Sequence, residues 1–263
     1  MKLEILECLP REKLNAPPLL FVHGAYQGAW CWKEHFLPHF SSRGFASYAL
    51  SLRGHGQSEG REKLHTFTLK DYAEDVLQVM CQMPGKPVLI GHSMGGAVVQ
   101  KILYAHPDMA AAAVLMASNP PSGMIKDLLR MNLFHFFDGR RLSKFNQGKA
   151  GSFPFKLFFP QELPAAKKTE YGKLLQPESK KALKEFVERV VPASFNPQAP
   201  ILVLCARKDK ILSEKTALAL AYTYKTKPVI FPDVHHEMML DTNWQHVAAE
   251  IQTFLHDKLT CAV

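Results

Sequence analysis

The sequence lacks any long apolar run, since no hydrophobic stretch approaches the roughly 20 residues that a helix needs to cross a bilayer. Its first residues include Glu4, Glu7 and a proline, where a signal peptide would need an unbroken apolar stretch. Cysteine is scarce, and the five cysteines are odd in number and form no CxxC pattern. They are Cys8, Cys31, Cys81, Cys205 and Cys261. We therefore expect reduced, mostly structural cysteines and a cytoplasmic protein.

Motifs for nucleic-acid binding are also missing, although the formal net charge is +8. We find no helix-turn-helix, zinc knuckle or RNP motif that would accompany a basic nucleic-acid surface. The excess positive charge is concentrated in residues 121–195, which hold 14 Lys and Arg, 7 Asp and Glu, and 10 of the 17 phenylalanines. We therefore expect no nucleic-acid partner. A basic and aromatic segment instead predicts possible peripheral contact with an anionic membrane.

Short apolar runs alternate with amphipathic stretches along most of the chain. The runs, which predict buried strands, are residues 19–22, 45–50, 88–90, 112–117, 201–206 and 227–231. The amphipathic stretches, which predict helices, lie near residues 33–42, 69–83, 95–106, 213–222 and 243–258. This alternation is typical of an α/β fold with a mostly parallel twisted sheet and helices on both faces.

The alternation stops after residue 117 and resumes at residue 200. The sequence between is helical in pattern, rich in Phe and Lys, and interrupted by glycines and prolines. We therefore predict a core domain of residues 1–119 and 197–263, with an inserted helical cap of residues 120–196 over the carboxyl edge of the sheet.

The stretch GHSMGG joins the predicted strand ending at residue 90 to the predicted helix starting at residue 95. Glycines two positions before and after Ser93 allow the strand and helix to approach closely around a sharp turn. Such a turn holds a serine in a strained conformation beside a helix N-terminus. Ser93 is therefore the candidate nucleophile.

With GHSMGG, FVHG at residues 21–24 and RGHGQS at residues 53–58, the chain resembles α/β-hydrolase fold enzymes over essentially its whole length. The resemblance implies that the cap follows the sixth strand in the family's count, residues 112–117 here. The family commonly has Asp just before the RGHGQS motif, near residue 51, where this chain has Ser51. That departure affects a loop near the site and leaves the proposed triad untouched.

The family order of nucleophile, acid and base places the base on the loop of residues 231–241. The family's histidine precedes an apolar pair and an acid, which indicates His236 as the base and leaves His235 as the alternative. The family's acid follows the preceding strand, which indicates Asp209. Asp233 and Asp241 are next in line for that role.

Acyl transfer builds negative charge on a carbonyl oxygen, which two backbone N–H groups usually stabilise. The resemblance assigns these donors to Met94, directly after Ser93, and to Ala25 in the loop HGAY. Tyr26, together with phenylalanines of the cap, is expected to line an acyl pocket. No cofactor or metal is expected, because the proposed chemistry needs only these groups.

The stretch HGAYQGAWCW is similar to the plant methylesterase and hydroxynitrile lyase group. The lyases carry Thr after the loop histidine and Lys after the catalytic one, where this chain has Gly24 and Glu237. We therefore expect a serine carboxylic-ester hydrolase, such as a carboxylesterase or a lipase-like enzyme, that acts on a small-molecule ester or lipid with a medium or longer acyl group. A hydroxynitrile lyase and a ligand receptor that retains the fold are the alternatives. The sequence does not predict an oligomeric state.

Overall fold

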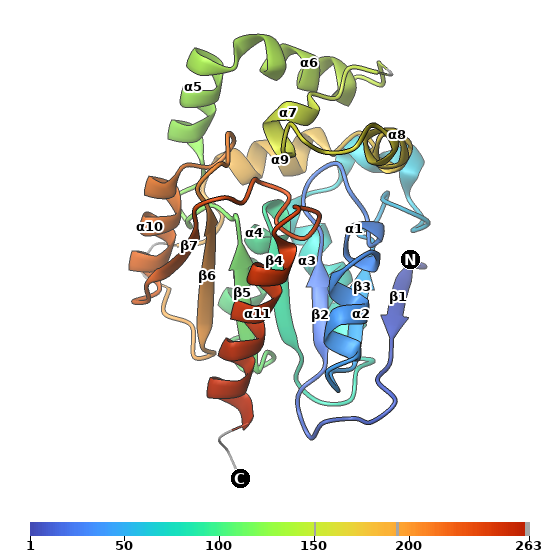
Figure 1. The fold of residues 1–263 in the computed structure, drawn as a ribbon, viewed down its shortest axis with the longest axis vertical. Helices are drawn as coiled ribbons and strands as arrows, with labels where there is room; N and C mark the ends of the chain where they lie inside the picture. Colours follow the sequence, from blue (N-terminus) through green and yellow to red (C-terminus); the bar gives the residue numbers. More distant parts are fainter. Residues whose placement is uncertain (150, 193–194, 261–263) are drawn as a thin grey trace.

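A seven-stranded sheet forms the centre of the computed structural model, which describes residues 1–149, 151–192 and 195–260 (Figure 1). The strands are β1 (Ile5–Cys8), β2 (Leu19–Val22), β3 (Ser47–Leu50), β4 (Val88–His92), β5 (Ala112–Met116), β6 (Ile201–Ala206) and β7 (Pro228–Phe231). Their order is β1-β3-β2-β4-β5-β6-β7, with β1 antiparallel to β3 and the other neighbouring pairs parallel. The predicted α/β fold with a mostly parallel sheet is therefore confirmed.

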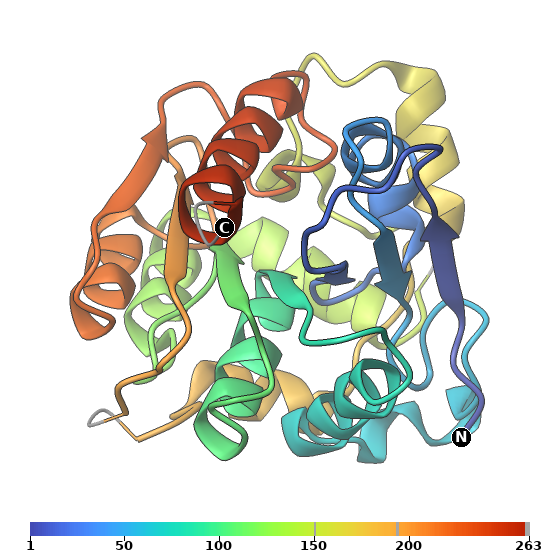
Figure 2. The same ribbon diagram turned by 90° about the horizontal axis from the view of Figure 1, so that it is seen from below.

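Helices cover both faces of this sheet, with α1, α2 and α11 on one face and α3 and α4 on the other (Figure 2). The helices of the core are α1 (Trp30–Lys33), α2 (Phe36–Ser41), α3 (Leu69–Met80), α4 (Met94–Ala105), α10 (Glu214–Thr223) and α11 (Trp244–Leu255), with short helical segments η1 (Arg61–Thr66) and η2 (His256–Thr260). Because both faces are covered, every residue of β2, β4 and β5 is buried. Those strands are accordingly almost entirely apolar, as parallel strands usually are.

The strand β1 was not predicted from the sequence. It lies at the edge of the sheet, and its residues alternate between exposed and half-buried. An edge strand of four residues with a polar face gives too weak an apolar run to be recognised by composition. The strand matters little for the site, which lies at the centre of the sheet.

Residues 120–196, named here the cap segment, lie between β5 and β6 in the sequence, and the helices of this segment lie beyond the carboxyl ends of the strands (Figure 1). Its helices are α5 (Ile125–Phe134), α6 (Phe136–Asn146), α7 (Phe155–Phe158), α8 (Ala165–Leu174) and α9 (Lys180–Val187). The strand before it is β5, the fifth along the described chain, whereas the cap was predicted to follow a sixth strand. The cap segment therefore stands over the sheet edge at which α/β folds place their sites.

No helix in the described part of the chain is long and apolar enough to cross a membrane. Four of the cysteines, Cys8, Cys31, Cys81 and Cys205, are free thiols. Cys261, the fifth, lies outside the described residues. Burial raises the pKa of the Cys31 thiol, which is consistent with a packing role for that side chain.

Candidate active site

Ser93 occupies the sharp turn between β4 and α4, with φ 51° and ψ −117°. A residue other than glycine rarely adopts a positive φ, so this conformation is strained. The flanking glycines make it possible, because a Cβ on Gly91 would lie 2.6 Å from the carbonyl oxygen of Gly95. A Cβ on Gly95 would in turn overlap the carbonyl oxygen of Val22 in β2. The GHSMGG sequence therefore packs strand and helix closely enough to present the Ser93 hydroxyl at the sheet edge.

The structure brings Ser93, His236 and Asp209 together from three separate loops. The Nε2 atom of His236 lies 3.1 Å from the Ser93 hydroxyl, and its Nδ1 atom lies 2.6 Å from Asp209 Oδ2. The other oxygen of Asp209 accepts the backbone N–H groups of Ile211 at 2.7 Å and Leu212 at 2.9 Å. The two backbone donors hold Asp209 Oδ1, so that Oδ2 is directed toward the imidazole of His236.

Electrostatics favour a basic imidazole at His236. Burial lowers its pKa, but the nearby Asp209 carboxylate, with a smaller contribution from Glu237, raises it above its usual value of 6.5. An imidazole whose pKa lies somewhat above the ordinary value is a competent proton acceptor near neutral pH. This arrangement can remove the proton of a hydroxyl group and hold it on a stabilised imidazolium.

The structure places the alternative base and acids elsewhere. His235 pairs with Asp241, whose Oδ2 lies 3.0 Å from His235 Nδ1 and also accepts the His235 backbone N–H. Asp233 is exposed and forms a salt bridge of 2.9 Å with Lys208. Of the two adjacent histidines, it is His236 that reaches the Ser93 hydroxyl.

The loop after β2 passes directly over Ser93. A Cβ added to Gly24 would lie 3.1 Å from the Cβ of Ser93, so only glycine allows the loop this close. The next residue, Ala25, faces the same cavity as Ser93. Met94 begins α4, and N–H groups in the first turn of a helix have no partner within that helix. The role of oxyanion donors for Ala25 and Met94 stays a prediction.

A short stretch of the cap segment, residues 176–179, forms hydrogen bonds to the loop after β2. Tyr26, whose φ is 70°, accepts the Gln176 N–H at its carbonyl oxygen at 3.0 Å. Its own N–H donates to Glu178 Oε2 at 3.4 Å. We call residues 176–179 the cap strap. Because it bonds both backbone groups of Tyr26, it supports the position of the neighbouring Ala25.

The Glu178 carboxylate anchors the cap strap in the core. It accepts the Tyr72 hydroxyl at 2.6 Å and lies 3.0 Å from His55 Nε2. Burial acts to raise the pKa of Glu178, but His55 and the hydrogen-bond donors outweigh burial and place that pKa below its usual value. An ionised carboxylate with several partners can remain buried, so the anchor is a stable one.

A second buried polar cluster, which sequence reasoning missed, lies beside the catalytic residues. Glu237 accepts a hydrogen bond from the Gln27 amide, and the Gln27 oxygen accepts the Gly24 N–H at 3.2 Å. These contacts connect the loop of His236 to the loop of Ala25. Gln27 and Glu237 are 210 positions apart, and nothing in one sequence pairs them. The sequence signal for this cluster was limited to one charged residue, Glu237, directly after the candidate base His236.

The potential metal ligands of the site are His92, His236 and Glu237, whose donor atoms lie within 4.8 Å of one another. Both ring nitrogens of His236 already face Ser93 and Asp209, and His92 Nε2 lies 2.9 Å from the His236 carbonyl oxygen. Only His92 Nδ1 and Glu237 then remain, fewer than the three protein ligands that catalytic zinc commonly has. The group therefore fits a metal poorly.

Glu237 should make stability depend on pH. Burial raises its pKa from the usual 4.5 to about 7, so between these values the folded state holds a proton that the unfolded state has lost. Stability should therefore fall as the pH rises from about 4.5 through 7, by at most about 3 kcal/mol. In Glu237→Gln this contribution should vanish, which urea unfolding of both proteins at several pH values would measure. An equal pH dependence in the two proteins would contradict the assignment.

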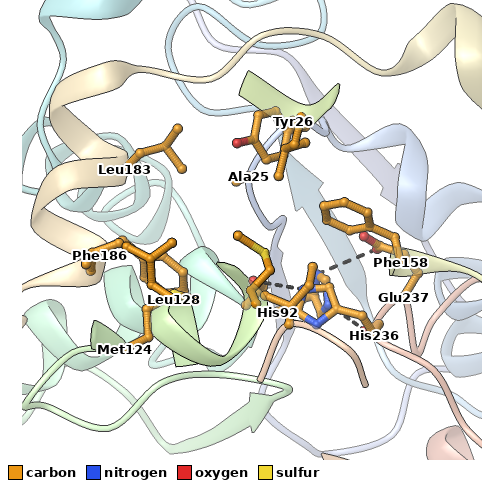
Figure 3. Close-up of a pocket in the computed structure, with 15 residues that line it drawn as sticks. Ala25, Tyr26, His92, Met124, Leu128, Phe158, Leu183, Phe186, His236 and Glu237 are labelled. Carbon is orange, nitrogen blue, oxygen red and sulfur yellow. Dashed lines mark hydrogen bonds and ion pairs between the residues drawn. The ribbon is translucent and has the colours of Figure 1, made fainter. Parts of the chain in front are cut away.

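An apolar cavity of about 200 Å³ opens above Ser93 (Figure 3). Ser93, His236 and Phe158 line it, as do Ala25 and Tyr26, which lie side by side in Figure 3. The cap segment contributes the apolar residues Met124, Leu128, Met131, Leu142, Leu183, Phe186 and Val187. Tyr26 thus lines the cavity as predicted, although most of the apolar wall consists of Leu, Met and Val. Many cap phenylalanines pack against one another instead, such as Phe153 against Phe145.

The family model described as "Alpha/beta hydrolase family" matches residues 19–250 of the chain. The chain belongs to the alpha/beta hydrolase family. The predicted membership of the α/β-hydrolase fold family is therefore confirmed, and it rests on nearly the whole chain.

Curated relatives of this alpha/beta hydrolase include plant esterases. Polyneuridine aldehyde esterase from Rauvolfia serpentina is 34% identical over 105 residues, which cover 39% of each chain. Methylesterase 8 from Arabidopsis thaliana is 31% identical over 123 residues, covering 46% of this chain and 44% of the relative. The chain therefore spans about two fifths of the length of the curated relatives it matches.

Solved structures of similar fold cover the alpha/beta hydrolase almost completely. A monoacylglycerol lipase of Paleococcus ferrophilus has a TM-score of 0.72 at 20% identity, covering 98% of this chain and 100% of that one. An esterase from Exiguobacterium antarcticum has a TM-score of 0.74 at 15% identity, covering 96% and 95%. At these identities the likeness concerns the fold alone.

Proposed function

We propose that this alpha/beta hydrolase is a serine esterase that cleaves carboxylic esters through an acyl-Ser93 intermediate. One observation carries the proposal: His236 is within hydrogen-bond distance of both Ser93 and Asp209. Ser93 and His236 also line an apolar cavity. The esterase relatives make the same chemistry plausible for this chain.

In the acylation step, His236 takes the proton of the Ser93 hydroxyl while its oxygen attacks the ester carbonyl carbon. The negative charge on the carbonyl oxygen is stabilised by the N–H groups of Ala25 and Met94. His236 then donates its proton to the departing alcohol oxygen, leaving Ser93 acylated. Asp209 holds the imidazole in the tautomer that presents an unprotonated Nε2 to the serine.

Deacylation repeats the sequence with water as the nucleophile. His236 removes a proton from the water, the hydroxide adds to the acyl carbon, and the Ser93 oxygen leaves and recovers the proton. The carboxylic acid is released and the enzyme returns to its starting state. None of these steps requires a cofactor.

Repeated turnover of p-nitrophenyl esters tests the proposal. The enzyme should release many equivalents of p-nitrophenolate, and a fluorophosphonate should label Ser93 and stop the release. A ligand receptor that retains the fold would also be labelled, but it would stop after about one equivalent. Labelling without repeated turnover on a series of esters would therefore support the receptor.

Hydroxynitrile lyase chemistry is disfavoured by Glu237. A cyanide leaving group gains from a nearby cation, but the residue after His236 is a buried carboxyl group. Its neighbours are the Gln27 amide and His92, whose pKa burial lowers well below the usual value, so His92 is neutral. Gln27 and His92 therefore supply no positive charge that would stabilise a cyanide leaving group near Glu237.

The apolar cavity leads us to propose a preference for medium or longer acyl groups. Each methylene moved from water into such a cavity contributes about 0.8 kcal/mol, or up to about fourfold in kcat/KM. Turnover should therefore rise from acetyl to hexanoyl esters. Leu128→Phe should remove most of this rise because Leu128 lines the cavity, whereas Leu129→Phe should not, because Leu129 points outward and is 64% exposed.

Steady-state kinetics on a graded series of p-nitrophenyl esters would measure the rise. Fastest turnover on the acetyl ester in the unmodified enzyme would contradict the proposed chain-length preference. It would leave the proposed esterase mechanism intact, since that mechanism does not depend on chain length.

A further inference from the structure

Exposed apolar side chains are concentrated on two helices at the outer end of the cap segment (Figure 1). Six of the fourteen large hydrophobic residues that the described part of the chain exposes fall in residues 125–137. They are Ile125, Leu129, Leu133, Phe134, Phe136 and Phe137, and we call them the α5–α6 ridge. Leu133 is 75% exposed and Phe137 is 80% exposed. A concentration of this kind usually marks a surface for binding another apolar phase or partner.

The exposed charges within residues 121–149, the stretch that contains the α5–α6 ridge, are all positive. Both acids of residues 121–149 are buried and have partners. Asp127 accepts the Ser213 N–H at 2.9 Å, and Asp138 lies 3.1 Å from Lys156. The exposed charged residues of the same stretch are Lys126, Arg140, Arg141, Lys144 and Lys149. The nearby acid Glu214 of α10, which lines a cavity with Ile125 and Lys126, is paired with Arg207 at 3.1 Å. An apolar ridge whose own stretch exposes only cations matches a lipid surface that carries negative headgroups.

Helix α5 also connects this surface to the active site, because it is apolar on two faces. Met124, Leu128 and Met131 line the cavity above Ser93. Leu129 and Leu133, on another face of the same helix, are exposed to solvent. A helix that packs only on a protein core would present a polar face outward. Here one helix separates the cavity from the outer apolar surface.

We propose that the α5–α6 ridge docks the enzyme on anionic lipid surfaces. Its Leu and Phe side chains enter the headgroup boundary, and Arg140, Arg141 and their neighbours contact the anionic headgroups. The sequence had led us to expect membrane contact somewhere in residues 121–195, and the proposal assigns it to these two helices. It does not depend on the proposed esterase mechanism, because binding is measured without turnover.

A second copy of this chain is a poorer occupant of the ridge. In a two-fold symmetric dimer, the same patch would face itself. Such a contact would bring the exposed cations of α6 against the same cations of the partner, with no exposed acid in this stretch to pair with them. An anionic surface removes that repulsion.

Co-sedimentation with vesicles tests the proposal, using phosphatidylcholine alone and phosphatidylcholine with phosphatidylglycerol. The enzyme should bind the anionic vesicles at least about tenfold more strongly, and the difference should shrink as salt is raised. Ser93→Ala should bind equally well. Equal binding to both vesicle types, or none to either, would overturn the proposal.

Variants locate the binding surface. Leu133→Ser with Phe137→Ser should weaken binding to anionic vesicles at least about tenfold, and Arg140→Gln with Arg141→Gln should weaken it roughly fivefold for each positive charge removed. The matched control is Leu218→Ser with Tyr222→Ser, which removes exposed apolar residues from α10 and should leave binding unchanged. All three double variants should hydrolyse a soluble butyrate ester at the normal rate.

The remaining outcomes separate the explanations. If the control pair weakens vesicle binding as much as the ridge pair, the assigned surface is wrong. If sedimentation velocity without lipid shows a dimer that the ridge pair converts to a monomer, the occupant is a second copy and the proposal fails. If soluble ester turnover is absent in every protein while vesicle binding behaves as expected, the esterase proposal fails and the docking proposal stands.

Discussion

Ser93→Ala is expected to lower kcat by at least about 10⁴-fold, and His236→Ala by a similar factor. The hydroxyl and the imidazole act in the same proton transfer, so removing either one removes the covalent route. The double variant should accordingly be scarcely worse than either single variant. Initial rates on a p-nitrophenyl ester, measured at high enzyme concentration, would cover the necessary range.

His235→Ala is the matched control for this experiment. His235 is the adjacent histidine, but its contacts are with Asp241, and we expect that variant to keep most of its activity. If His235→Ala were the inactive variant and His236→Ala the active one, the assignment of the base would be off by one residue. Melting curves for all variants would show that the folded state is retained.

Asp209→Asn is expected to lower kcat by roughly 10³- to 10⁴-fold with little change in stability. An amide oxygen can still accept the N–H groups of Ile211 and Leu212, which keeps the loop in place. The amide nitrogen would then face His236 Nδ1 as a donor. That contact favours the tautomer with its proton on Nε2, which cannot accept the Ser93 proton.

Near-normal activity in Asp209→Asn would mean that the orienting acid lies elsewhere, with Asp233 or Asp241 next in line. The contacts of those two residues argue against either role. Asp233 is bound to Lys208 on the surface, and Asp241 holds His235 and the start of α11. Asp233→Asn and Asp241→Asn should therefore leave the rate of the chemical step close to normal.

The sheet could be predicted from sequence because parallel strands buried on both faces give unbroken apolar runs. The runs at β2 and β6 were located to the residue, and the other predicted runs to within two residues at each end. Strand β1 was missed because its four residues, half of them exposed, give no such run. The physical signal is burial on two faces, and an edge strand lacks it.

The residues proposed to form the triad were selected because the family resemblance points to a local pattern that follows each of three strands. The structure places His236 within hydrogen-bond distance of both Ser93 and Asp209. The Gln27–Glu237 contact could not be predicted, because each residue is unremarkable in its own stretch. Their pairing arises only when the loops after β2 and β7 meet at the sheet edge. Contacts of this kind depend on tertiary structure alone.

The cap strap has a consequence for how such an enzyme can diversify. Residues 120–196 supply most of the apolar wall around the substrate cavity, and the same stretch bonds both backbone groups of Tyr26 beside the oxyanion loop. Exchanging this insertion for another would therefore alter substrate choice and the support of the loop in one event. A chimera would need to carry the Gln176 and Glu178 contacts with it. In the proposed esterase, substrate choice and the support of this loop would therefore change together.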